Sequence, residues 1–215
     1  MKMTAGTTFV FCILLLSAGP SFADDNDLPV PADEFVFCTV CHGVQLMGNS
    51  IMAAPRLSGM ESWYVERQLQ AFRKGWRGTH STDLSGNEMQ PMAESLSESQ
   101  VATVAEFVNK TRSAPPPTTI TGDAANGEVL YRSCSACHGA NAQGNEVLGA
   151  PALTGLNDWY LVTQLENFRN GTRGGDSADT WGAQMAAAAV LLEDDQAVKD
   201  VVTFITGLTS NQTSN

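Results

Sequence analysis

The sequence predicts an all-α protein built from two tandem copies of one small folding unit. Three observations predict it: a short cysteine–histidine motif occurs twice, the residues after each copy match at a constant offset of 96 positions, and apolar residues recur at helical intervals in each copy. An unbroken register over this length indicates duplication. The matched pairs are Gly43 and Gly139, Gly48 and Gly144, Pro55 and Pro151, Leu57 and Leu153, Trp63 and Trp159, Tyr64 and Tyr160, Gln68 and Gln164, Leu69 and Leu165, Phe72 and Phe168, Arg73 and Arg169, Gly75 and Gly171, Arg77 and Arg173, Gly78 and Gly174, and Met89 and Met185.

The two copies begin differently. Residues 24–37 are acidic and contain proline, and Pro31 suits the first turn of a short helix that leads into the first motif. The corresponding stretch of the second copy, residues 122–131, is typical of a longer capped helix.

Further helices follow in each copy. The spacing of apolar residues predicts helices over 63–72 and 159–168, each ended by a glycine. The segments from there to Met89 and Met185 are rich in Gly, Ser, Thr and Asp, which indicates loops. The last helices are expected over 97–110, where Ser97 begins a capping box, and over 193–208.

The ends of the chain and the junction between copies complete the expected organisation. Residues 1–23 resemble a secretory signal peptide, with Lys2 before a short apolar run and a small-x-small cleavage site at its end. An uncleaved anchor is the alternative, but this run is too short to span a bilayer, so no integral membrane span is expected after cleavage. The expected parts are a first domain at 24–110, a proline-rich, semi-rigid linker at 111–121, a second domain at 122–209 and a disordered tail at 210–215.

The repeated motif has the form C-x-x-C-H, the attachment pattern of a c-type haem. Two cysteines three residues apart lie on one face of a helical turn, where each thiol can add to a porphyrin vinyl group. The histidine that follows is then held under the iron. A redox dithiol and a zinc site are the alternatives, but neither copy lies in a strand–helix alternation and the two pairs are too far apart for a zinc ribbon. The motif residues are Cys38, Cys41, His42, Cys134, Cys137 and His138.

Haem iron in electron-carrying cytochromes commonly takes a methionine thioether as its second axial ligand. Met89 and Met185 each lie 47 residues after the motif histidine of their copy, in segments expected to be polar loops, which favours ligation over an ordinary packing role. Met92 is a rival in the first copy, but its counterpart is Ala188. The remaining methionines after the motif, Met47, Met52 and Met60, are expected to be packing residues.

Other repeated residues have two open interpretations each. The carbonyl of Pro55 or Pro151 could accept the Nδ1 proton of the motif histidine, or the proline could simply form a turn. The repeated arginines could pair with haem propionates or lie at solvated helix ends. These arginines are Arg73, Arg77, Arg169 and Arg173.

The charge of the chain restricts its partners. Loss of Lys2 with the signal peptide would change the formal net charge from −11 to −12. Such acidity argues against nucleic acid and anionic membrane surfaces as partners. It suits a redox protein with a basic docking patch and equally a surface that only confers solubility. All four cysteines after residue 23 belong to the two motifs, so none remains for a disulfide.

At these residues the chain resembles class I c-type cytochromes, and its duplicated form is similar to the dihaem cytochrome c4 family. The resemblance implies two haem c groups. One would be held by Cys38, Cys41, His42 and Met89, and the other by Cys134, Cys137, His138 and Met185. It also implies two domains that face each other through their haem propionates. The chain departs from the family where Pro31 replaces the glycine found at Gly127, a position that lets the first and last helices cross closely.

Two functions follow from this interpretation. The first is a periplasmic dihaem electron carrier, free or peripheral at the inner membrane, rather than an enzyme. Its expected partners are a membrane oxidase, a cytochrome bc-type complex or a dehydrogenase. The alternative is a haem enzyme of the peroxidase or sulfur-compound oxidase type, in which one iron has a labile site. The presence of a methionine candidate in both copies favours the carrier.

Overall fold

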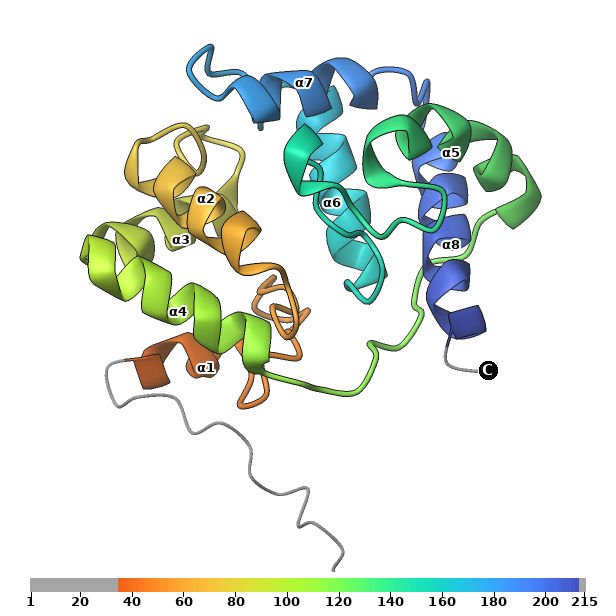
Figure 1. The fold of residues 1–215 in the computed structure, drawn as a ribbon. Coiled ribbons are helices and arrows are strands. Elements are labelled where there is room, and N and C mark those ends of the chain that lie inside the picture. Colours follow the sequence, from red (N-terminus) through yellow and green to blue (C-terminus); the bar gives the residue numbers. More distant parts are fainter. Residues whose placement is uncertain (1–34, 213–215) are drawn as a thin grey trace, which may run out of the picture.

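The computed structural model describes residues 35–212, so the predictions for the signal peptide and for Pro31 lie outside the described residues. The described part is helical, without β-strands, apart from two isolated bridges at matched positions, Asn49–Ala54 and Asn145–Ala150. The first four helices form one half of the molecule and the last four form the other (Figure 1). Their bounds are α1 (Val36–His42), α2 (Ser62–Arg73), α3 (Leu84–Glu94), α4 (Glu98–Lys110), α5 (Ala124–His138), α6 (Asp158–Arg169), α7 (Thr180–Ala189) and α8 (Asp195–Gln212), with a short 3₁₀ turn, η2 (Glu146–Leu148), before α6.

Most predicted helices are present and begin as the sequence indicates. At the start of α4, the Ser97 hydroxyl accepts the Gln100 N–H while the Gln100 side chain accepts the Ser97 N–H, which confirms the capping box. At the start of α5, the Asp123 carboxylate accepts two backbone N–H groups. The end of α8 differs from the prediction, because the helix continues to Gln212 and includes residues 210–212 of the expected disordered tail.

The prediction of loops before Met89 and Met185 is wrong in part, because both methionines lie inside helices, α3 and α7. Each helix begins at an aspartate, Asp83 or Asp179, whose carboxylate accepts the N–H of a glycine three residues later. A Cβ at Gly86 would lie only 2.0 Å from the Asp83 carboxylate, so glycine here permits the cap.

The first and last helices of the second half cross at Gly127. A Cβ there would lie 2.0 Å from the carbonyl oxygen of Asp200 in α8, so only glycine allows this approach. The Asp200 carboxylate also accepts the Asn126 side-chain N–H at 2.8 Å and the Asp123 N–H at 2.8 Å. The close crossing expected at Gly127 is therefore confirmed in the second half.

The core of each half lies between its long helices. In the first half α2 packs against α3 and α4, and in the second half α6 packs against α7 and α8. The apolar stripes of α2, α4, α6 and α8 are buried in these contacts, which removes them from water. The buried side chains of these stripes include Val65, Leu69, Phe72, Val101, Val104, Val108, Leu161, Leu165, Phe168, Val198, Val201, Val202 and Ile205.

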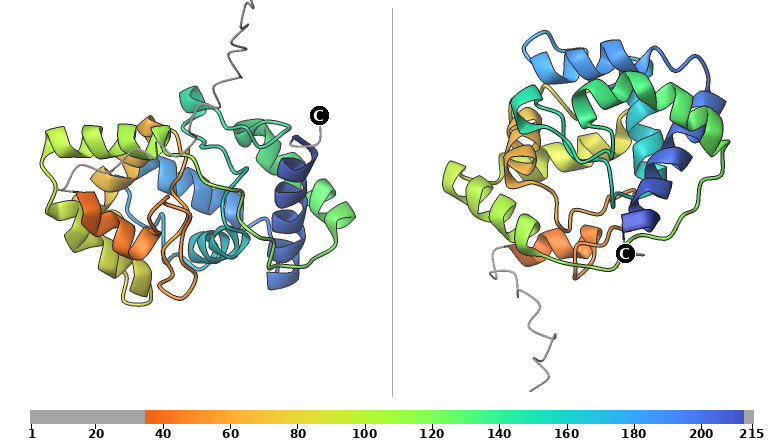
Figure 2. Two further views of the ribbon diagram at one scale, coloured as in Figure 1. Left: turned by 90° about the horizontal axis from the view of Figure 1, so that it is seen from below. Right: turned by 45° about the vertical axis from the view of Figure 1, so that its right-hand side comes forward.

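The linker joins the end of α4 to the start of α5 along the outside of the molecule, and it forms neither helix nor strand over residues 111–123 (Figures 1 and 2). It is fixed to the second half by Asp158, whose carboxylate accepts the N–H of Thr119, the N–H of Ile120 and the Thr119 hydroxyl. Arg56 binds it from the first half, donating to the Ser113 hydroxyl and carbonyl. The linker is thus held by both halves.

Candidate haem-binding sites

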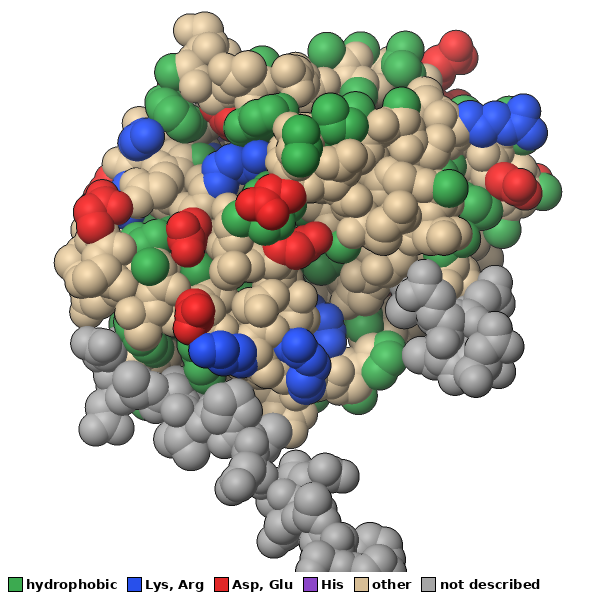
Figure 3. Space-filling view, in the orientation of Figure 1, with side chains coloured by type: hydrophobic (Ala, Val, Ile, Leu, Met, Phe, Trp, Pro, Cys, Tyr) green, Lys and Arg blue, Asp and Glu red, His purple; other side chains and the backbone are tan. Residues whose placement is uncertain are grey.

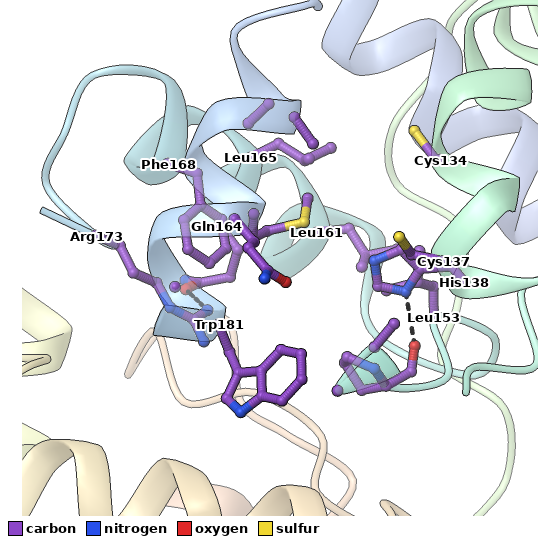
Figure 4. Close-up of a pocket in the computed structure, with 18 of the residues that line it drawn as sticks. Cys134, Cys137, His138, Leu153, Leu161, Gln164, Leu165, Phe168, Arg173 and Trp181 are labelled. Atoms are coloured by element: carbon purple, nitrogen blue, oxygen red, sulfur yellow. Dashed lines mark hydrogen bonds between the residues drawn. The ribbon is translucent and has the colours of Figure 1, made fainter. Parts of the chain in front are cut away.

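The second half brings all four of its predicted site residues to one cavity. Cys134, Cys137 and His138 lie on the last turn and a half of α5, and Met185 lies on α7. All four line a cavity of about 170 Å³. Figure 4 shows Cys137 and His138 on one side of this space, facing the helix that carries Leu161. Two thiols and an imidazole on one wall and a thioether among the lining residues form the donor set that a covalently attached haem requires.

One part of the remaining wall of this cavity is apolar. Leu161, Leu165 and Phe168 of α6 and Leu153 of the preceding loop line it (Figure 4). These side chains exclude water and match the apolar face of a porphyrin. The sequence spacing of α6 places them together, since 161, 165 and 168 recur at helical intervals.

The motif histidines of both halves are oriented in the same way. His42 Nδ1 lies 2.7 Å from the carbonyl oxygen of Pro55, and His138 Nδ1 lies 2.8 Å from that of Pro151. A carbonyl can only accept, so Nδ1 carries the proton and Nε2 is free to bind a metal. Of the two open interpretations of Pro55 and Pro151, the one in which the carbonyl accepts the histidine proton is confirmed. Burial lowers the pKa of both histidines, which keeps the imidazole in its neutral, metal-binding form.

The first cysteine of each motif is partly buried. Burial raises the pKa of Cys38 to about 11 and also raises the pKa of Cys134. Both groups are therefore neutral thiols at neutral pH.

In the first half the predicted residues lie on equivalent elements. Cys38, Cys41 and His42 belong to α1, whose end at Gly43 has a φ of 81°, and Met89 belongs to α3. Cys38 and Met89 both pack against the hydrophobic core. The rival Met92 is 44% exposed. Of the methionines expected to pack, Met60 is buried, whereas Met47 and Met52 are exposed, so that prediction is wrong for the latter two.

A polar cluster joins the two halves beside the cavity. Arg77 donates to Gln68 at 2.9 Å and across the interface to Gln164 at 3.1 Å. Its repeat partner Arg173 donates to Gln164 at 2.6 Å and across the interface to Gln68 at 2.6 Å. Arg173 is only 6% exposed, so the interpretation of a solvated helix end is wrong for it. The cluster follows the internal two-fold repeat.

The other two repeated arginines lie at helix ends. Arg73 forms an ion pair with Glu98 at 2.6 Å, and Arg169 forms one with Asp195 at 3.1 Å. Both carboxylates lie in the first turn of the last helix of their half. The second pair is one residue out of the 96-residue register, as the last helices themselves are.

Two buried arginine nitrogens test whether the residues fit a haem. The Nε atoms of Arg67 and Arg77 are buried and have no hydrogen-bond partner. Arg67 lines the cavity of the second half although it belongs to α2 of the first, and its guanidinium lies over the rings of Trp63 and Trp181 at 4.8 and 5.4 Å. Orphaned cationic donors suit the carboxylates of a porphyrin. The residues present therefore fit a haem.

Sequence reasoning missed that α2 of the first half forms a wall of the second site. Tyr64, Arg67 and Gln68 all line that cavity. The signal was present for two of them, since Tyr64 and Gln68 recur at Tyr160 and Gln164. Arg67 is matched by a threonine and carries no repeat signal.

Comparisons with known proteins agree with this geometry. The cytochrome c family model matches twice, over residues 33–112 and 124–209. The chain belongs to the cytochrome c family. It is 29% identical to cytochrome c-552 of Acidithiobacillus ferridurans over 96% of this chain and 90% of that protein. It is 35% identical to the thiosulfate dehydrogenase electron acceptor of Stutzerimonas stutzeri strain A1501, over 67% of this chain and 68% of that one.

Among solved structures, the reduced cytochrome c4 of Pseudomonas stutzeri superposes with a TM-score of 0.64 and 26% identity, covering 81% of this chain and 94% of that one. The fold is therefore that of two tandem cytochrome c domains, and the chain is a cytochrome c4-like electron carrier with two haem c groups.

One face of the molecule carries side chains of both charges. On the face shown in Figure 3, acidic and basic side chains are interspersed rather than gathered into patches of one sign.

Within residues 35–212, each helix is too short or too polar to cross a membrane.

Proposed function

We propose that this chain is a periplasmic carrier that moves single electrons between respiratory-chain or dehydrogenase partners through two haems, each ligated by one histidine and one methionine. Residues 24–110 and 122–209 would form the two haem domains, joined by the linker at 111–121. The observation that carries the proposal is the shared cavity of Cys134, Cys137, His138 and Met185, with every one of these residues repeated 96 positions earlier.

The protein's own residues would do three things in this function. Cys38, Cys41, Cys134 and Cys137 would attach the porphyrins covalently. His42 and His138, fixed through Nδ1 by a proline carbonyl, would each present Nε2 to an iron. Met89 and Met185 would each offer a thioether to the iron of their half and keep water and small ligands away. When bound, each haem supplies one-electron chemistry between Fe(III) and Fe(II), and a thioether ligand raises the potential.

The partners would be other redox proteins. One relative is named as the electron acceptor of a thiosulfate dehydrogenase, which supports a dehydrogenase as electron donor. A membrane oxidase or a cytochrome bc-type complex would complete the chain as acceptor or donor. Export through a signal peptide at 1–23 would bring the chain to the compartment where such partners lie.

Carbon monoxide tests this function against the alternative of a haem enzyme. The purified holoprotein is reduced without oxygen, carbon monoxide is added and the visible spectrum is recorded. An unchanged Soret band is expected, because both irons would be closed by a thioether. A shift in about half of the haem would reveal one open iron and would favour a peroxidase or sulfur-compound oxidase instead.

A further inference from the structure

The residues that begin α2 and α6 are Glu61 and Asn157, which match in the 96-residue register. Both are N-cap residues with the same backbone conformation, φ −63° and ψ 132°. An N-cap side chain normally accepts an N–H of its own helix. Neither side chain does so here. Their carbonyl or carboxylate oxygens are therefore available for another partner.

Each of these side chains reaches into the other half of the molecule. Asn157 Oδ1 accepts the backbone N–H of Arg56 at 2.6 Å, and Glu61 Oε1 accepts the backbone N–H of Ala152 at 2.9 Å. The two N–H groups come directly after Pro55 and Pro151 in the chain. They belong to the same peptide groups whose carbonyl oxygens accept from His42 and His138.

These contacts form a crossed relay. In the first half, His42 donates to a peptide group that in turn donates to Asn157 of the second half. In the second half, His138 donates to a peptide group that donates to Glu61 of the first. Because a peptide group is a resonant unit, an acceptor at its N–H increases the negative charge on its carbonyl oxygen.

Two glycines leave room for the relay. A Cβ at Gly48 would lie 2.5 Å from the Arg56 nitrogen and 2.8 Å from Asn157 Oδ1. A Cβ at Gly144 would lie 2.5 Å from the Ala152 nitrogen. Both glycines also have φ above +80°, so a side chain is excluded by space and by backbone conformation. Both peptide groups therefore have a glycine in close contact with their nitrogen, at matched positions of the two halves.

We propose that Glu61 and Asn157 are positioning residues, each setting the electron affinity of the haem in the opposite half through this peptide group. The proposal rests on histidine ligation in the proposed function. The two ends differ in charge: Glu61 is a carboxylate, whereas Asn157 is a neutral amide. A charged acceptor makes the stronger hydrogen bond. The Pro151 carbonyl should therefore draw the His138 proton more strongly, which makes that imidazole a more electron-rich ligand and favours Fe(III).

Electrostatics supports the same direction. A negative charge near an iron ligand also favours the oxidised iron by direct attraction. Glu61 should thus lower the potential of the second haem by both routes, and Asn157 should leave the first haem without this effect.

The test changes the charge at each of the two positions in the full-length holoprotein. Glu61→Gln keeps the shape and the acceptor but removes the charge, and Asn157→Asp adds a charge at the matched position. Glu66→Gln, one turn further along α2, removes the same charge outside the relay and serves as the control. Redox titration followed by NMR would give the potential of each haem and the chemical shift of each histidine Nδ1 proton.

We expect Glu61→Gln to raise the potential of the second haem, changing its reduction equilibrium by roughly threefold to tenfold, where a tenfold change is about 59 mV for one electron. Asn157→Asp should lower the potential of the first haem by a similar factor. The Nδ1 proton of His138 should move in the first variant, and that of His42 in the second.

Equal shifts in Glu61→Gln and Glu66→Gln, or an unmoved His138 Nδ1 proton, would overturn the relay while the electron-carrier function stands. A protein that binds carbon monoxide at one iron, or that lacks two reversible one-electron steps, would instead show that the proposed function itself has failed.

Discussion

The two halves of the molecule share the hydrogen bonds around the motif histidine and at the start of the methionine-bearing helix, whereas the exposed residues around the motif differ. The histidine–proline hydrogen bonds, the capping aspartates Asp83 and Asp179 and the Arg–Gln cluster recur at matched positions. Around the motifs the surfaces diverge: Val40 and Val44 of the first half are 73% and 74% exposed, and alanines replace both in the second. The contacts around the residues that would hold each haem are therefore the same in both halves, whereas the exposed residues that a partner protein would contact differ.

The largest effect is expected from removing one pair of motif cysteines. Cys38→Ala with Cys41→Ala, and separately Cys134→Ala with Cys137→Ala, should each lower the covalent haem content from two to one per chain, because each pair attaches one group. The ratio of bound haem to protein measures this. Loss of both haems in either variant would contradict two separate attachment sites.

The next largest effect is expected at the crossing of α5 and α8. Gly127→Ala should destabilise the second half by about 1–3 kcal/mol, because the added methyl group would overlap the Asp200 carbonyl. Gly207→Ala on α8 is the control, since a Cβ there meets nothing within 4 Å, and it should be stabilising by up to about 1 kcal/mol.

Thermal unfolding of the holoprotein compares the two glycine variants. Equal midpoints would show that the helices do not cross as closely as the structure has them.

A smaller effect should distinguish the two halves at the linker. Asp158 binds the linker, whereas its repeat counterpart is Ser62. Asp158→Asn should cost about 1.5–3 kcal/mol at pH 7, since charge-assisted hydrogen bonds are lost. Burial raises the pKa of Asp158, but the hydrogen bonds from Thr119, Ile120 and Trp159 outweigh it and lower the pKa overall.

The sign of the pH dependence follows from that lowered pKa. The stabilisation by Asp158 is fully present above the unfolded pKa of about 3.9 and is lost as the pH falls through the lower pKa of the folded state. The difference between wild type and Asp158→Asn should therefore shrink below about pH 4. Denaturant titrations at a series of pH values measure it, with Ser62→Ala as the control. A difference that grew on acidification would contradict this account.

The fold was largely predictable because duplication reveals itself in sequence. Two unrelated segments rarely agree at so many positions, so the register located the motifs, the central helices and the methionine candidates together. The helices around Met89 and Met185 were missed because these segments are rich in Gly, Ser, Thr and Asp, a composition typical of loops, and include Gly86 and Gly182. Each glycine N–H is bound by the aspartate three residues earlier, and the periodicity of apolar residues does not reveal such a cap.

The contacts between the halves could not be predicted from the sequence. Glu61 and Asn157 differ chemically, so nothing in the register indicates that both side chains bind the opposite half. The same holds for Arg67, which lines the opposite cavity. Such contacts depend on how the two units pack, and helical periodicity within one unit carries no information about that packing.

The axial ligands are tested most directly by proton NMR of the fully reduced holoprotein. The ring current of a haem displaces the methyl and methylene resonances of a ligated methionine far from their usual positions. Two displaced sets are predicted, one lost in Met89→Leu, the other lost in Met185→Leu, and both kept in Met92→Leu. A single displaced set in the wild type, or the loss of one set in Met92→Leu, would contradict methionine ligation at matched positions in both halves.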